Sequence, residues 1–226
     1  MAVIEGGTSA AVAEVGAAAA KGLHVQLRPF DAGALGHYRL ASVSGTMAAA
    51  LAAGSQIFQF KWTDATRFAV VTSLKVRFLT LTRFTAGTIT DFGVDAFIAR
   101  TYTGGSGGTA LTITGDNGAL RAAYGTTLVS EIRVPTTAAL GAVTTLDTQP
   151  FTQGFGAGVQ VTPSATVQYE TDNIPLLDYQ ARTESGESPV ILAQNEGIIV
   201  RNRAVWPIAG TGIYSFEIQW SEVTAF

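Results

Sequence analysis

The C-terminal part of the chain alternates apolar and polar residues with the period of two that is typical of a half-buried strand. Four apolar residues fall on one face and four polar residues on the other: Tyr214, Phe216, Ile218 and Trp220 against Ser215, Glu217, Gln219 and Ser221. A chain that ends in such a long alternating strand usually places it inside a sheet. We therefore predict an internal strand here and an all-β module around it.

Two further strands are predicted just before this one. Val190 to Ala193 is apolar on both faces, which is typical of a strand covered on both sides. A second segment places Ile198, Val200, Ala204 and Trp206 on one face. The residues between them, Asn195-Glu196-Gly197, suit a hairpin with a bulge because Gly can adopt a positive φ.

The longest alternating run extends from Arg67 to Phe84. One face carries Phe68, Val70, Leu74, Val76 and Phe78. At Leu79 and Leu81 the apolar residues change to the face of Lys75. Because a slip of one residue turns every side chain to the other face, we predict either a bulge near residues 78–79 or cover on both faces.

Shorter segments complete the pattern. We expect strands within 23–28, 37–44, 58–62, 92–98, 128–134 and 165–169, a flexible glycine-rich loop at 104–108, and either two helical turns or a flat connection within 45–54. About ten strands without a convincing long helix indicate a sandwich, a jelly roll or a barrel. The predicted organisation is an Ala/Gly-rich N-terminal arm over 1–22 and a single β domain over 23–226.

Composition narrows the possible functions. Only 14% of the 226 residues are charged and the net charge is −3, so nothing forms the basic footprint that phosphate binding requires. Cysteine is absent, which excludes disulfides and Cys-ligated zinc. No apolar run is long enough for a transmembrane helix. We expect no nucleic-acid or membrane partner.

Candidate chemistry is sparse. His24 and His37 both lie on predicted strands, and no spacing supports a metal site. The segment 104–108 matches G-x-S-x-G, but a nucleophile elbow needs a following helix and a later His, and both histidines precede Ser106. The acids within 170–187 do not have the spacing of an EF-hand loop. We predict no catalytic residue, no cofactor and no metal.

Several short motifs resemble those of tailed-phage virion proteins. The opening 4–15 is similar to an N-terminal arm found in many of them. Arg28-Pro29, the segment 35–39 and the segments 193–197 and 200–202 resemble a set of uncharacterised phage structural proteins. The resemblance covers both ends and is loose over 85–188. It implies a virion component, assembled in the host cytoplasm, that is a jelly-roll trimer decorating or cementing the capsid.

The first functional hypothesis is therefore a non-enzymatic decoration or cement protein. It would form a homotrimer, contact the major capsid protein or other virion proteins, and dock through its arm. The expected interface residues are Leu79, Leu81, Ile191, Ala17, Ala18, Ala19 and Ala20. The alternative is a tail or fibre module whose loops 101–120 and 136–163 bind a host glycan. A third hypothesis is a glycan-degrading enzyme.

Overall fold

The fold was analysed in a computed structural model of residues 1–226. The structure describes residues 5–6, 11–12, 36–48, 51–85, 92–113, 118–120, 124–154, 158–160, 166–169, 174–179, 189–206 and 209–224. The chain divides into two compact units, Met1–Phe30 and Asp31–Phe226. In the first unit, β1 (Glu5–Gly6) pairs antiparallel with β2 (Ala11–Val12). This two-residue ladder lies within the predicted Ala/Gly-rich arm, residues 1–22.

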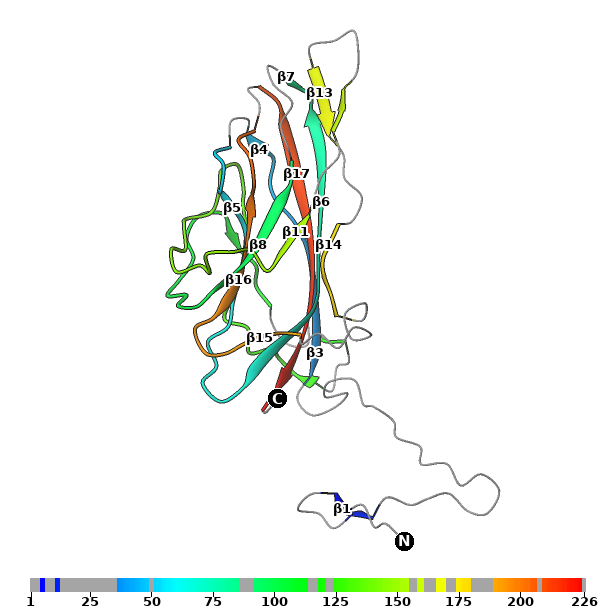
Figure 1. The fold of residues 1–226 in the computed structure, drawn as a ribbon, viewed down its shortest axis with the longest axis vertical. Coiled ribbons are helices and arrows are strands. Elements are labelled where there is room, and N and C mark those ends of the chain that lie inside the picture. Colours follow the sequence, from blue (N-terminus) through cyan, green and yellow to red (C-terminus); the bar gives the residue numbers. More distant parts are fainter. Residues whose placement is uncertain are drawn as a thin grey trace, which may run out of the picture. The chain divides into compact units, whose positions relative to one another are not determined.

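The second unit is an antiparallel β-sandwich, as predicted (Figure 1). One layer, called here the β16 sheet, has the order β11-β8-β16-β5-β10-β9. Its strands are β11 (Thr152–Gly154), β8 (Val94–Ala99), β16 (Gly197–Asn202), β5 (Gln56–Lys61), β10 (Glu131–Val134) and β9 (Thr109–Ala110). The other layer, the β17 sheet, has the order β14-β6-β17-β3. Its strands are β14 (Ile174–Asp178), β6 (Phe68–Thr82), β17 (Thr211–Val223) and β3 (His37–Val43).

Shorter strands extend these layers. β15 (Val190–Leu192) continues the β14 edge of β6, and β4 (Met47–Ala48) continues the β3 edge of β17. A third sheet has the order β12-β13-β7, formed by β12 (Gly158–Gln160), β13 (Thr166–Tyr169) and β7 (Phe84–Thr85). Helical geometry among the described residues is limited to the single positions Tyr124 and Tyr179. Of the two alternatives predicted for 45–54, the described residues 45–48 and 51–54 contain β4 and a turn rather than helical turns. The strand expected at 23–28 lies outside the described residues.

The order in which the chain visits the layers is that of a jelly roll. Successive strands β3, β5, β6 and β8 alternate between the two sheets, as do β14, β16 and β17. The last strand, β17, inserts between the first strand β3 and the long strand β6. The prediction that the C-terminal strand is internal is confirmed.

The core lies between the two sheets and follows the predicted alternation. Tyr214, Phe216, Ile218 and Trp220 are all at most 2% exposed. Trp220 stacks on Tyr38, with ring centroids 5.7 Å apart, and meets the edge of Phe60 at 5.3 Å. Aromatic pairs in these geometries add to the free energy gained from burial alone.

Two details of β6 bear on the predictions. Its register against β17 shifts at Thr72 and at Leu81, while residues 78–79 pair without interruption, so of the two alternatives the bulge near 78–79 is excluded and cover by another subunit remains a prediction. The bulge at Thr72 puts Ala69 and Val71 in the core with Leu74, so the expectation that Phe68 and Val70 share the core face was wrong. Apolar content did not reveal this because the residues on both sides of the bulge are apolar.

The predicted hairpin around Asn195-Glu196-Gly197 was also wrong. β15 pairs with β6 in one layer, whereas β16 pairs with β5 and β8 in the other. The turn therefore carries the chain between the sheets. Asn195 adopts the positive φ, 62°, and Gly197 is required for space, because a Cβ there would lie 2.3 Å from the Phe60 carbonyl oxygen.

Candidate interaction surface

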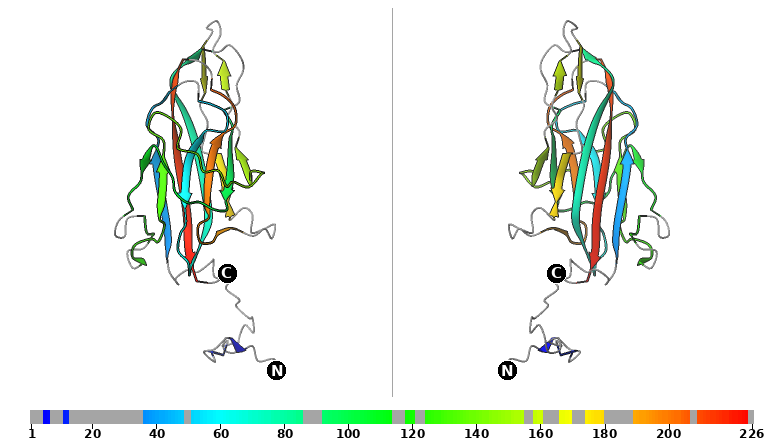
Figure 2. Two further views of the ribbon diagram at one scale, coloured as in Figure 1. Left: turned by 90° about the vertical axis from the view of Figure 1, so that its left-hand side faces the viewer. Right: turned by 90° about the vertical axis from the view of Figure 1, so that its right-hand side faces the viewer.

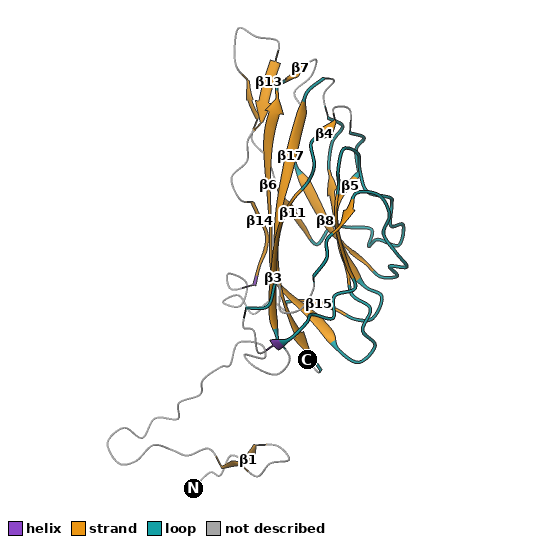
Figure 3. Ribbon diagram, turned by 180° about the vertical axis from the view of Figure 1, so that it is seen from behind, coloured by secondary structure: helices purple, strands orange, loops and turns teal. Residues whose placement is uncertain are grey.

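The outer face of the β16 sheet is covered by the protein's own loops, residues 100–113 and 135–150 (Figure 3). Gln59 on β5 is fully buried under them. Its Nε2 donates to the Gly141 carbonyl at 2.8 Å, and its Oε1 accepts from the Tyr102 hydroxyl at 2.9 Å. Gln56 donates to the Val143 carbonyl at 2.8 Å. These bonds satisfy polar groups that would be costly to bury unpaired.

The glycine-rich segment 104–108 is part of this cover. The Gly141 amide donates to the Ser106 carbonyl at 2.8 Å and joins the two loops. A Cβ at Gly105 would lie 2.5 Å from Gln59 Oε1, and one at Gly108 would lie 2.2 Å from the Val134 carbonyl oxygen. Glycine at these two positions therefore permits close packing within the segment that was predicted to be a flexible loop.

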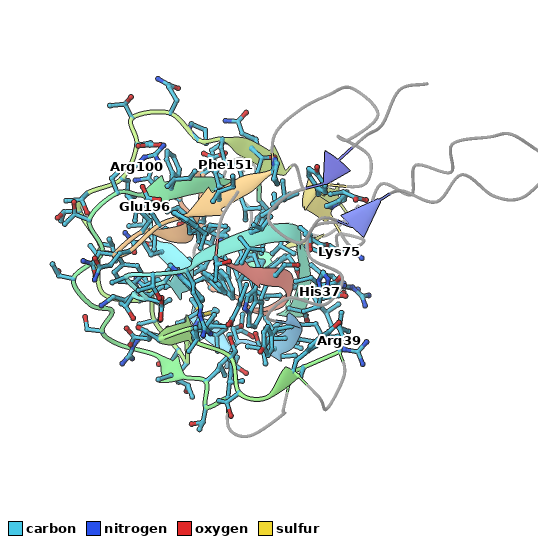
Figure 4. All side chains as sticks on the ribbon, turned by 90° about the horizontal axis from the view of Figure 1, so that it is seen from below. His37, Arg39, Lys75, Arg100, Phe151 and Glu196 are labelled. Atoms are coloured by element: carbon cyan, nitrogen blue, oxygen red, sulfur yellow. The ribbon has the colours of Figure 1, made fainter. Side chains whose placement is uncertain are left out.

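An ion-pair cluster lies at the rim of this cover. Arg100 contacts Asp147 at 2.8 Å and Glu196 at 3.1 Å. The hydrogen bond from Arg100 holds the pKa of Asp147 below its ordinary value. Figure 4 places Arg100 and Glu196 on the opposite side of the sandwich from Lys75, His37 and Arg39.

The outer face of the β17 sheet has a different character (Figure 2, right). Its middle rows are polar: Ser73, Lys75 and Arg77 on β6, and Ser215, Glu217 and Gln219 on β17. One end is apolar. Leu79 pairs directly with Ile213, and both are partly exposed. Val43 and Leu81 are 56% and 51% exposed, among the large apolar side chains that the structure leaves most open.

The predicted interface residues fall partly on this face. Leu79 and Leu81 lie near each other at its apolar end. Ile191, on β15, pairs with Val70, nine residues along β6 from Leu79 and thus about 30 Å away. The structure therefore does not bring Ile191 into one cluster with the two leucines. Ala17, Ala18, Ala19 and Ala20 lie outside the described residues.

Sequence reasoning missed Val43 and Ile213. Both lie on the outer face, Val43 opposite Ser215 and Ile213 opposite Leu79. For Val43 the signal was available, since it shares the period-2 face of Arg39 and Ala41. The pairing of Ile213 with Leu79 depends on the register between β6 and β17, which alternation alone does not give.

The remaining titratable groups at the end of β17 serve packing. The Ser221 hydroxyl lies 2.6 Å from His37 Nδ1, but Ser221 is fully buried and leaves no room for an acyl group. Glu222, 1% exposed, accepts hydrogen bonds from the Thr127 hydroxyl and the Leu128 amide. Burial raises the pKa of Glu222, and these bonds partly oppose that increase.

Searches for other sites and for relatives were negative. Within the described ranges, no three His, Asp or Glu residues gather in a way that could hold a metal ion. None of the described residues form a helix long and apolar enough to cross a membrane. Comparisons with protein-family models, curated proteins and solved structures found no match to the chain.

Proposed function

We propose that this chain is a non-enzymatic structural protein of a tailed-phage virion, a head decoration or cement protein that acts through contacts with its own copies and with the coat. The observation that carries the proposal is the outer face of the β17 sheet. It combines exposed apolar residues, Val43 and Leu81, with a polar centre in which Lys75 and Glu217 are cross-strand neighbours. Contiguous apolar patches on a soluble protein commonly mark contact sites.

Two further features support an assembly role. Jelly rolls are a recurrent architecture of viral coat domains, although a fold alone does not fix a function. The charged content of 14% leaves much of the surface to small residues, which are readily buried against another protein. The virion context itself rests on the sequence resemblance at the two ends of the chain.

The alternative glycan-binding module would use the loops over the β16 sheet. The polar side chains described there, including Gln59, Tyr102 and Arg100, bond to one another and to the loop backbone. Because these polar groups already bond within the protein, the outer face of the β17 sheet is favoured over these loops as the contact surface.

The proposal is tested by locating the protein in particles. An epitope-tagged chain would be produced in infected cells, and purified particles would be examined by electron microscopy with gold-labelled antibody. We expect label on heads. Label confined to tails would support the alternative, and unlabelled particles that assemble normally would reject a structural role.

A further inference from the structure

The outer face of the β17 sheet is self-complementary about one particular axis. β6 and β17 are antiparallel neighbours, and their outward side chains stand directly opposite each other in rows. Lys75 is opposite Glu217, and Leu79 is opposite Ile213. In these two rows a basic residue has an acidic neighbour and an apolar residue has an apolar neighbour, and in the row between them Arg77 is opposite Ser215.

We propose that two copies of the chain pair face to face through this surface, about a two-fold axis parallel to β6 and β17 and midway between them. This inference rests on the proposed assembly function and specifies its contact. Rotation about such an axis leaves the position of each row along the strands unchanged. It places β6 of one copy over β17 of the other. Lys75 then faces Glu217 of the second copy, and Leu79 faces Ile213 of the second copy.

The outer strands follow the same rule. Asp178 on β14 pairs with Ser73, and Arg39 on β3 pairs with Gln219, so Arg39 and Asp178 share one row at the two sides of the face. The same rotation exchanges the two sides and brings Arg39 over Asp178 of the second copy. Isologous contacts of this kind make every favourable pair twice.

Other axes give poorer pairing. An in-plane axis perpendicular to the strands reverses the rows, and when centred on Arg77 it sets Lys75 against Leu79 of the second copy. A three-fold axis cannot superimpose β6 and β17 reciprocally. The homotrimer expected from the sequence would therefore require a different surface from the one described here.

The central charges are available for this contact. No ion pair among the described residues includes Lys75 or Glu217, although the two residues are neighbours in register. Each side chain is partly buried within the sheet surface. Pairing with the second copy would place an oppositely charged side chain opposite Lys75 and another opposite Glu217.

The small area of the outer face of the β17 sheet predicts a modest affinity between the two copies. Eight residue steps and four strands span roughly 500 Å² at about 3.3 Å per residue and 4.8 Å between strands. A standard interface buries about 800 Å² per partner. We therefore expect a dimer that dissociates on dilution.

Charge reversal in the full chain tests the axis. Lys75→Glu places two acidic residues in each central contact, and Glu217→Lys places two basic ones there. We expect each variant alone to dimerise about tenfold or more weakly by sedimentation equilibrium. An equimolar mixture of the two variants restores both opposite-charge pairs in the heterodimer, and it should recover the wild-type dissociation constant.

The mixture also separates interface effects from misfolding, since a misfolded variant would not recover on mixing. Thr144→Glu, an exposed position on a loop over the other sheet, is the control and should dimerise normally. A trimer, or a dimer insensitive to both reversals, would overturn the two-fold contact and leave the assembly function standing. A wild-type monomer at all concentrations would overturn both.

Discussion

At the residue scale, Trp220 and its neighbour Gln219 test the register of the terminal strand. Trp220 is 1% exposed between Tyr38 and Phe60, whereas Gln219 lies on the outer face. We expect Trp220→Asp to lower the free energy of unfolding by about 3–5 kcal/mol, because it opens a cavity and buries an unpaired charge. Gln219→Asp should cost under about 1 kcal/mol. Urea denaturation measures both, and similar losses would contradict the assigned register.

Glu222 gives the chain a titrating group inside the fold. Burial raises its pKa above the ordinary value of 4.5, so the folded state holds this proton more tightly than the unfolded state. The free energy of unfolding should therefore fall as the pH rises from about 4.5 through the folded-state pKa, with a slope of up to about 1.4 kcal/mol per pH unit. Glu222→Gln removes this ionisation and keeps an oxygen that accepts from Leu128.

The stability of Glu222→Gln relative to the wild type should accordingly be greatest at neutral pH, should shrink as the pH falls through the folded-state pKa towards about 4.5, and should stay constant below that pH. Thermal melts at several pH values measure this difference. A difference for Glu222→Gln that stayed constant across the pH range would show that its carboxyl group does not titrate differently in the two states.

At the element scale, the loop cover depends on glycines that admit close approach. At Gly108 φ is 57°, and a Cβ would lie 2.2 Å from a backbone oxygen that cannot rotate away. We expect Gly108→Ala to destabilise the cover by about 1–3 kcal/mol and to speed amide exchange in 139–147 at least several-fold. Gly104→Ala is the control, since no atom lies within 4 Å of its Cβ position. Equal exchange rates in the two variants would contradict a packed cover.

Alternation predicted the elements better than their connections. The apolar face of β17 and the strand within 37–44 followed from side chains that must face the core. The bulge at Thr72 did not, because Val70 and Val71 are both apolar and either can face inward. The hairpin at 195–197 failed because a turn signal does not say whether the next strand stays in the same sheet. Alternation also predicted that Leu79 and Leu81 lie on the face opposite the core, whereas the cross-strand pairing of Leu79 with Ile213 depends on register and did not follow from it.

At the scale of the whole molecule, the two sheets have different outer faces. The β16 sheet buries Gln59 and Ile199 under loops, while the β17 sheet presents Val43 and Leu81 at one end. A jelly roll with one face closed by its own loops offers the other face to partners. All of the residues that form the proposed two-fold contact lie within the unit Asp31–Phe226.

The contribution of the arm can therefore be separated from self-association. We expect a chain lacking residues 1–21 to keep the dissociation constant of the full chain, because none of the contact residues is removed. Attachment to stripped phage particles should weaken, since the arm is the segment that we expect to dock on the coat. Sedimentation equilibrium measures the first quantity and co-sedimentation with particles the second. A truncated chain that attached with full affinity would show that docking uses the sheet face alone, and one that lost self-association would place part of the dimer contact in the arm.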